Sequence, residues 1–109
     1  MVRATGVSVL VQQGRTTQTL AKVERISMDA AELPAGGASL TLGERVTLFF
    51  RVSGMLPLKA SAEVSEVTDK KVVVNFFELE PAMRDMINRV MLAELSANFR
   101  SSRDALRVR

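Results

Sequence analysis

Apolar and polar residues alternate along much of the first 79 residues, which is typical of strands with one buried face. The alternation is clearest in residues 45–52 and 56–64. Every second residue of these two runs is apolar, namely Val46, Leu48, Phe50 and Val52 in the first and Leu56, Leu58, Ala60, Ala62 and Val64 in the second. Similar runs occupy residues 6–13, 16–27, 31–33 and 72–76. The pattern therefore predicts about six strands, with a bulge or a change of face within 16–27.

Short turn sequences separate these runs. They are Gly14-Arg15, Met28-Asp29, Ser-Gly-Met-Leu at 53–56 and Thr-Asp-Lys-Lys at 68–71, and a glycine-rich loop follows Pro34. Connections this short join antiparallel neighbours. Because no helical spacing interrupts the strands before residue 79, we expect a small closed or nearly closed antiparallel barrel over about residues 5–79.

The spacing of apolar residues changes at Glu80-Pro81, where proline suits the first turn of a helix. The apolar residues that follow recur at helical spacing: Met83, Met86, Ile87, Val90, Met91 and Leu95. This spacing predicts an amphipathic helix over about residues 81–98. Such a helix covers the barrel, including Phe77, or joins a second chain, or does both with its two ends. Residues 99–109 are interpreted as a basic tail that frays or extends the helix.

The composition is that of one small globular domain, because 47% of the 109 residues are hydrophobic and 25% are charged. The chain has no cysteine and no histidine, which excludes disulfides, thiolate metal sites and histidine-based catalysis. Acidic pairs such as Glu63 with Glu66 lack an accompanying base or a glycine-rich phosphate loop. We therefore expect no catalytic residues, no metal, no cofactor and no enzymatic activity.

The net charge of +3 is unevenly distributed, since all of the excess lies after residue 80. The basic residues near the end are Arg100, Arg103, Arg107 and Arg109, which are interpreted as a solvated tail, with contact to phosphates or anionic lipid as the alternative. With no Trp or Tyr and a charge-neutral barrel, we expect no nucleic-acid binding. The absence of a signal-like segment or a bilayer-spanning apolar run predicts a cytoplasmic location without membrane insertion.

Three sequence stretches resemble those of one protein family. They are Ile-Ser-x-x-Ala-Ala-x-Leu at 26–33, Leu-x-x-Gly-Glu-x-Val-x-Leu-Phe at 40–49, and Val-x-Val-x-Phe at 72–76, followed by a helix. Their order and spacing resemble the PilZ family over nearly the whole chain. The resemblance implies a six-stranded antiparallel PilZ-like barrel with a C-terminal amphipathic helix. It also implies a relation to receptors for cyclic di-GMP, whose signature is an Arg-x-x-x-Arg run and an Asp/Asn-x-Ser-x-x-Gly turn.

The signature residues are mostly absent from this chain. The turn maps onto Arg25, Ser27 and Ala30, so a donor replaces the acceptor and a methyl group replaces the glycine. No arginine lies four residues after Arg3 or Arg15. The resemblance therefore implies a degenerate ligand turn, and we expect no useful affinity for cyclic di-GMP. The alternative is a receptor that uses Arg3 and Arg15, while Ser27 is expected to hydrogen-bond within its own turn.

Function is then expected to lie in protein contacts. By resemblance, the chain is a non-enzymatic adaptor or regulator in bacterial signalling, surface motility or type IV pilus function. We expect the contact surface on the second half of the helix, at Met91, Leu92, Leu95 and Phe99, where it joins a homodimer or docks a protein partner. Neither the partner nor the pathway follows from these residues.

Overall fold

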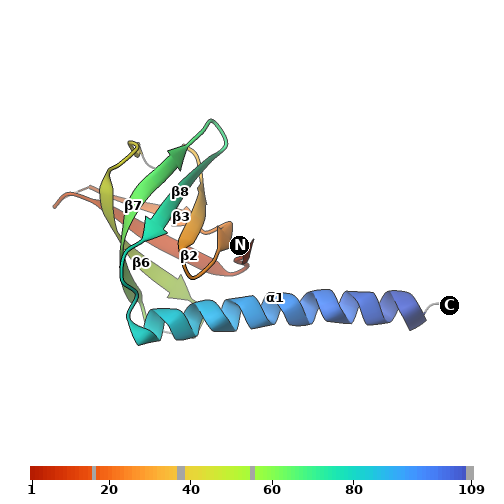
Figure 1. Ribbon diagram of the computed structural model, residues 1–109. Coiled ribbons are helices and arrows are strands. Elements are labelled where there is room, and N and C mark those ends of the chain that lie inside the picture. Colours follow the sequence, from red (N-terminus) through yellow and green to blue (C-terminus); the bar gives the residue numbers. More distant parts are fainter. Residues whose placement is uncertain (16, 37–38, 55, 108–109) are drawn as a thin grey trace.

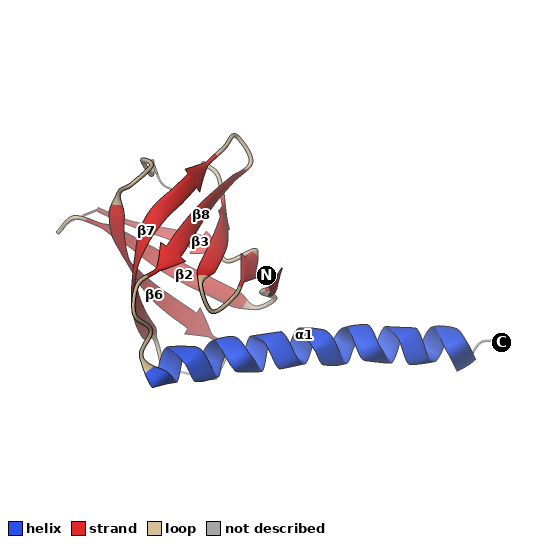
Figure 2. Ribbon diagram, viewed as in Figure 1, coloured by secondary structure: helices blue, strands red, loops and turns tan. Residues whose placement is uncertain are grey.

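The computed structural model describes residues 1–15, 17–36, 39–54 and 56–107, with side chains to Ala97. Eight strands are followed by one helix (Figures 1 and 2). The strands are β1 (Val2–Arg3), β2 (Val7–Gln13), β3 (Thr17–Lys22), β4 (Arg25–Ile26), β5 (Ala30–Pro34), β6 (Arg45–Val52), β7 (Leu58–Val67) and β8 (Lys71–Phe76). The helix is α1 (Pro81–Arg107). The expectation of a mainly β chain with a C-terminal helix is confirmed.

All neighbouring strands are antiparallel, in the order β1-β4-β5-β8-β7-β6-β2-β3. The prediction of six strands is wrong for two reasons. The first residues add β1, and the run predicted as one strand over 16–27 divides into β3 and β4. It divides because its chain changes partner: Val23 N donates to Val7 O on one side, and Glu24 N donates to Glu32 O on the other.

The sheet is curved but not closed. Within the described residues, β1 and β3 are its two edges and no ladder joins them. The stretch from Thr17 to Ile26 brings the two ends of the sheet near each other, because β3 pairs with β2 while β4 pairs with β5. Of the closed or nearly closed barrel that the sequence predicts, the closed form is wrong, and the structure is an open, curved eight-stranded sheet.

The core lies on the inner face of this sheet, as the alternating pattern predicts. Fully buried side chains include Val9, Val11, Leu48, Phe50, Val64 and Val74. The rings of Phe50 and Phe76 meet edge to face, with centroids 5.9 Å apart. One ring of each phenylalanine pair thus faces inward. Leu56 is an exception to the predicted alternation, because it precedes β7 and is exposed.

The helix begins at Pro81, as predicted, but ends at Arg107 rather than at about residue 98. The expected basic tail at 99–109 is therefore helical as far as Arg107. Residues 99–107 contain no proline or glycine to end the helix. The first part of α1 packs across one end of the sheet, against β1 and β7, and the rest extends past it (Figure 1).

Met83, Met86 and Ile87 are buried in the core, and Val90 and Met91 pack at its border. Leu95, the last residue of the predicted apolar stripe, is exposed, so the part of the stripe that packs on the sheet is shorter than the stripe itself. The helix therefore covers the sheet with about its first ten residues only.

Candidate functional site

The degenerate ligand turn is a tight connection between β4 and β5 that uses its own polar groups. Ser27 Oγ accepts hydrogen bonds from the N–H groups of Asp29 and Ala30, both at 3.2 Å. Ser27 N also donates to Ala30 O at 2.8 Å. The Ser27 hydroxyl thus bonds within its turn, as the sequence predicts. Ala30 is buried but lies outside the core cluster, to which its neighbour Ala31 belongs.

Arg25, the first residue of the mapped turn, also has partners within the chain. Its Nη2 donates to Met1 O at 2.8 Å, and its Nη1 lies 3.8 Å from Glu32 Oε2. Glu32 is buried to 7% exposure, and Lys71 Nζ lies 3.4 Å from its other oxygen. Arg25 therefore helps to neutralise a buried carboxylate, which gives it a structural role at this position.

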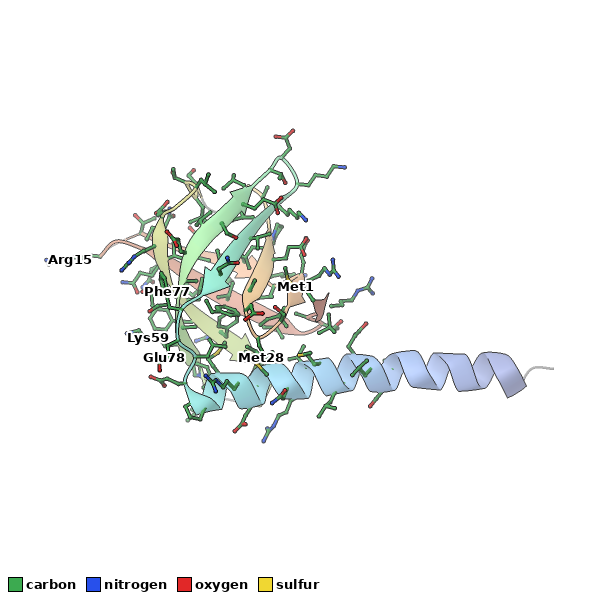
Figure 3. The ribbon with its side chains drawn as sticks, in the orientation of Figure 1. Met1, Arg15, Met28, Lys59, Phe77 and Glu78 are labelled. Carbon is green, nitrogen blue, oxygen red and sulfur yellow. The ribbon has the colours of Figure 1, made fainter. Side chains whose placement is uncertain are left out.

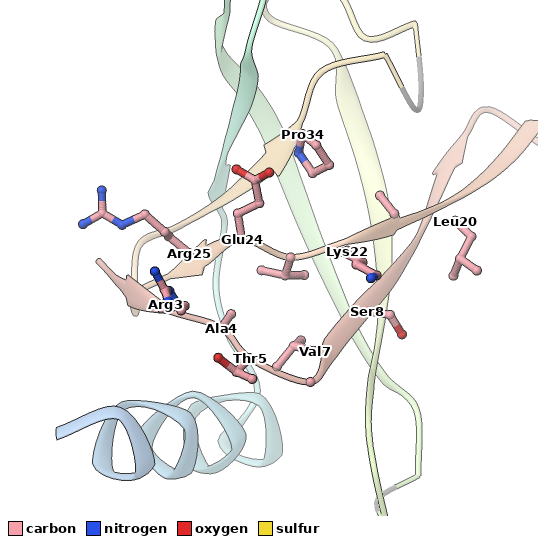
Figure 4. A pocket seen from close by; sticks show the side chains of 13 residues that line it. Arg3, Ala4, Thr5, Val7, Ser8, Leu20, Lys22, Glu24, Arg25 and Pro34 are labelled. Carbon is pink, nitrogen blue, oxygen red and sulfur yellow. The ribbon is translucent and has the colours of Figure 1, made fainter. Parts of the chain in front are cut away.

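A groove of about 980 Å³ brings several of the candidate residues together (Figure 4). Its charged lining residues are Arg3, Lys22, Glu24 and Arg25, so the lining carries a net positive charge. Arg3 and Arg25 are direct cross-strand neighbours on β1 and β4. Apolar side chains of Val7, Leu20 and Val23 and the ring of Pro34 complete the groove. An anionic or partly apolar group fits this lining best.

Arg15 does not join this groove. It lies at the turn between β2 and β3, on the opposite side of the sheet from Met1 (Figure 3). The structure therefore separates the two arginines that the sequence offers as alternative nucleotide contacts, Arg3 and Arg15. Within the described residues, Lys22 and Arg25 are the cations that share the first groove with Arg3.

A second groove, of about 640 Å³, lies between the first part of the chain, the end of β6 and α1. Arg3 and Thr5 line both grooves. The helix contributes Arg89, Val90 and Glu94 to this second groove. Arg3 thus stands at the junction of the two grooves.

The predicted partner surface on α1 is exposed in its central part. Leu92 and Leu95 have 63% and 56% of their surface accessible. Met91 is half-buried at the border of the core, so it belongs partly to the fold. The fourth predicted residue, Phe99, lies outside the described side chains.

Phe77 is not covered by the helix, contrary to expectation. Its side chain is 42% exposed, and the guanidinium carbon of Arg45 lies 5.1 Å from the ring centroid. Such a cation–π contact covers an aromatic ring without a second layer of protein. The sequence does not reveal this pairing, because Arg45 and Phe77 are far apart along the chain.

The two grooves are lined by charged and apolar side chains that could bind a ligand. Among the described residues, no cluster of three or more acidic side chains could hold a metal ion. In the same part of the chain, no helix has both the length and the apolar composition needed to cross a bilayer. Comparison with known proteins finds no matching family model and no matching curated protein.

Proposed function

We propose that this chain is a non-enzymatic adaptor that acts through protein contacts, with the exposed face of α1 as its contact surface. The observation that carries the proposal is the helix itself. It runs for 27 residues, yet among its described side chains, which reach Ala97, those buried against the sheet all lie in its first part. Beyond that part, Leu92 and Leu95 are large apolar side chains that face solvent on a regular element.

Helix geometry separates this surface from the buried stripe. Leu92 follows Met86 by six residues, which at about 100° each turns it by about 120° from the buried side. Leu95 lies three residues after Leu92 and Phe99 four residues after Leu95, and Ser102 then occupies the next position of this spacing. Apolar residues at alternating spacings of three and four residues are typical of a helix that packs against another helix. A helical partner surface therefore fits this face.

The resemblance to the PilZ family supports the adaptor assignment. It rests on the stretches at 26–33, 40–49 and 72–76, which form part of β4, β5, β6 and β8. If the stretch from Thr17 to Ile26 is counted as one bent strand and β1 is set aside, the chain has six strands, the number that a PilZ-like barrel has. On this interpretation the chain works in the bacterial cytoplasm, in signalling, surface motility or type IV pilus function.

The proposal is tested with two matched double variants. Leu92→Glu with Leu95→Glu places two charges on the exposed apolar face. Ala93→Glu with Ala97→Glu adds the same charges at two exposed positions that lie about 100° or more around the helix from Leu92 and Leu95, and serves as the control. Sedimentation velocity from low to high micromolar concentration should show self-association that the Leu92/Leu95 variant loses and the control keeps.

A wild type that stays monomeric leads to the second part of the test, which is affinity capture with all three proteins. A protein partner retained by the wild type and the control, but not by the Leu92/Leu95 variant, supports an adaptor that docks another chain. Capture of nucleic acid in place of protein, or the same captured proteins with all three baits, contradicts the proposal.

The alternative function is a cyclic di-GMP receptor with a non-standard arginine set. Arg3 favours it, because this residue lies in the cationic groove beside Arg25 and Lys22. Two features disfavour it, since Ser27 and Arg25 already bind partners in the chain and Arg15 lies elsewhere. Calorimetry at near-physiological salt should show no binding. Micromolar or tighter binding that Arg3→Ala abolishes would instead support the receptor.

A further inference from the structure

The edge strand β3 has a side that is free for hydrogen bonding. It pairs with β2 alone, in a register that places Ala21 opposite Val9. The bond from Val23 N to Val7 O shows that odd-numbered residues of this stretch point their backbone groups toward β2. Because ladder bonds alternate along antiparallel strands, the groups of Gln18, Leu20 and Lys22 point the other way.

These free groups face the gap between β3 and β5. The N–H of Glu24, the next even-numbered residue, donates to Glu32 O on β5, while its carbonyl accepts from Ala4 N beside β1. The groove that contains Leu20, Lys22 and Pro34 lies on this side of β3. Before Glu24 the two strands do not pair. Within the described part of the chain, Gln18, Leu20 and Lys22 have no backbone bond across the gap. The sheet is therefore open along β3 and joined at Glu24.

The two sides of the gap differ in how they are protected. On β5, the backbone groups of Glu32 point toward β4. Those of Pro34, two residues later, point to the same side and therefore toward the gap, where proline offers no N–H donor. On β3 there is no proline, the register with β2 has no bulge, and the only charge is Lys22 at the end of the strand. Soluble proteins usually blunt a free edge with such devices. Strand β3 can thus form backbone hydrogen bonds with an added strand, whereas the proline of β5 interrupts such pairing on the other side of the gap.

The surroundings of the free edge indicate what it binds. The first groove contains Leu20, Ala21 and Lys22 of β3 together with Pro34 of β5, so it includes the gap (Figure 4). Leu20 is 66% exposed at the middle of the strand. At the Lys22 end, Arg3 and Arg25 lie in the same groove, and their charge exceeds that of Glu24. An apolar residue at the centre and acidic residues at one end complement this surface.

We propose that an extended peptide segment of a partner protein adds to β3 as a further strand, with an apolar residue beside Leu20 and acidic residues near Lys22, Arg3 and Arg25. This mode of binding takes its affinity from main-chain hydrogen bonds and its specificity from the flanking side chains. Some Cα atoms of β3 and β5 lie within 8 Å of each other, which is less than the two strand spacings of about 4.8 Å that an inserted strand needs, so the peptide pairs with β3 where the gap is wider than this. The site is distinct from the exposed face of α1 and does not depend on it.

The first experiment identifies a ligand with a random library of twelve-residue peptides displayed on phage. Enriched sequences should alternate apolar and polar residues, contain no central proline and carry acidic residues at one end. Amide hydrogen exchange then locates the bound peptide. In the free protein the amides of Gln18, Leu20 and Lys22 should exchange faster than those of Thr19 and Ala21, and the peptide should slow all three.

The second experiment uses Leu20→Pro, which removes a donor from the free edge and leaves the bonds to β2 in place. This variant should weaken binding of the enriched peptide by about tenfold or more, whereas Leu20→Thr, which keeps the donor, should weaken it less. Lys22→Glu should weaken binding severalfold, and Lys70→Glu, at an exposed turn outside the groove, should not. Gln18→Pro repeats the donor test if Leu20→Pro does not fold.

Four results would overturn the proposal. In the first two, the amides of Gln18, Leu20 and Lys22 are already protected in the free monomer, or the selected peptides shift resonances of α1 and not of β3. In the third, binding survives both proline variants unchanged. Finally, protection that grows with protein concentration in the absence of peptide would assign the edge to a second copy of this chain. Because these readouts concern β3, they are independent of the Leu92 and Leu95 variants.

Discussion

The first ten residues of α1 and the residues that follow them share a helical spacing of large apolar side chains, but these side chains lie in opposite environments. Met83, Met86 and Ile87 are at most 1% exposed, whereas Leu92 and Leu95, on the same helix, are more than half exposed. Both parts have large apolar side chains at helical spacing. The difference arises from what lies beside the helix, because the sheet covers only its first part (Figure 1). An apolar helical face therefore indicates that something packs there, and the fold decides whether that is the same chain.

The largest effect is expected from charges placed in the buried part. Met86→Glu with Val90→Glu should unfold the protein, because an unpaired buried carboxylate costs several kcal/mol against a total stability of about 5–15 kcal/mol. Leu92→Glu with Leu95→Glu is the matched change in the exposed part and should leave the fold intact. Far-ultraviolet circular dichroism and thermal melting distinguish the two. A folded Met86/Val90 variant would mean that α1 does not complete the core.

A smaller and more quantitative contrast comes from single truncations to alanine. Met86→Ala should lower the free energy of unfolding by about 2–5 kcal/mol, because it removes buried methylenes and leaves a cavity. Leu92→Ala should change it by no more than about 0.5 kcal/mol. Urea titrations of both variants measure the difference. Similar losses at the two positions would remove the distinction between the two parts of the helix.

The sequence predicts the regular elements well, because their spacing is local. The alternation in 45–52 places Val46, Leu48 and Phe50 in the core, and Pro81 marks the start of the helix. The division of the run 16–27 is not local. Nothing in Val23-Glu24 itself shows that one residue bonds to β2 and the next to β5. The number of strands therefore depends on which strands pair with each other, and the local spacing of residues does not reveal these partners.

The candidate sites are less predictable than the fold. Ser27 is a residue type that bonds within tight turns, so its role follows from local chemistry. The meeting of Arg3, Lys22 and Arg25 in one groove depends on which strands become neighbours. The same holds for the free edge of β3, since its six residues resemble those of any strand until the sheet order is known. Long-range arrangement therefore creates the groove and the free edge of β3, whereas the apolar residues of the exposed face of α1 follow from local spacing.

The border between the two parts of α1 can be located with Val90. This side chain is half-buried and packs against the edge of the core. Val90→Ala should lower the free energy of unfolding by about 1 kcal/mol, between the values for Met86 and Leu92, because part of its surface already contacts water. Urea unfolding in the same series gives the comparison. A loss as large as that of Met86→Ala would move the border toward Leu92.

The smallest effect is expected when the chain is shortened to end after Asn98. Among the described side chains, which reach Ala97, the core residues contributed by α1 end at Met91, and the helix beyond them extends past the sheet (Figure 1). Residues of a helix without tertiary packing add little stability, and the free energy of unfolding should change by less than about 0.5 kcal/mol. Ending the chain after Asn88 is the control, since it also removes Val90 and Met91 and should destabilise the fold clearly. Urea unfolding measures both proteins. A loss of more than about 1 kcal/mol on removal of residues 99–109 alone would show that the second part of the helix also stabilises the folded chain. The two parts would then differ only in how much free energy of unfolding each contributes.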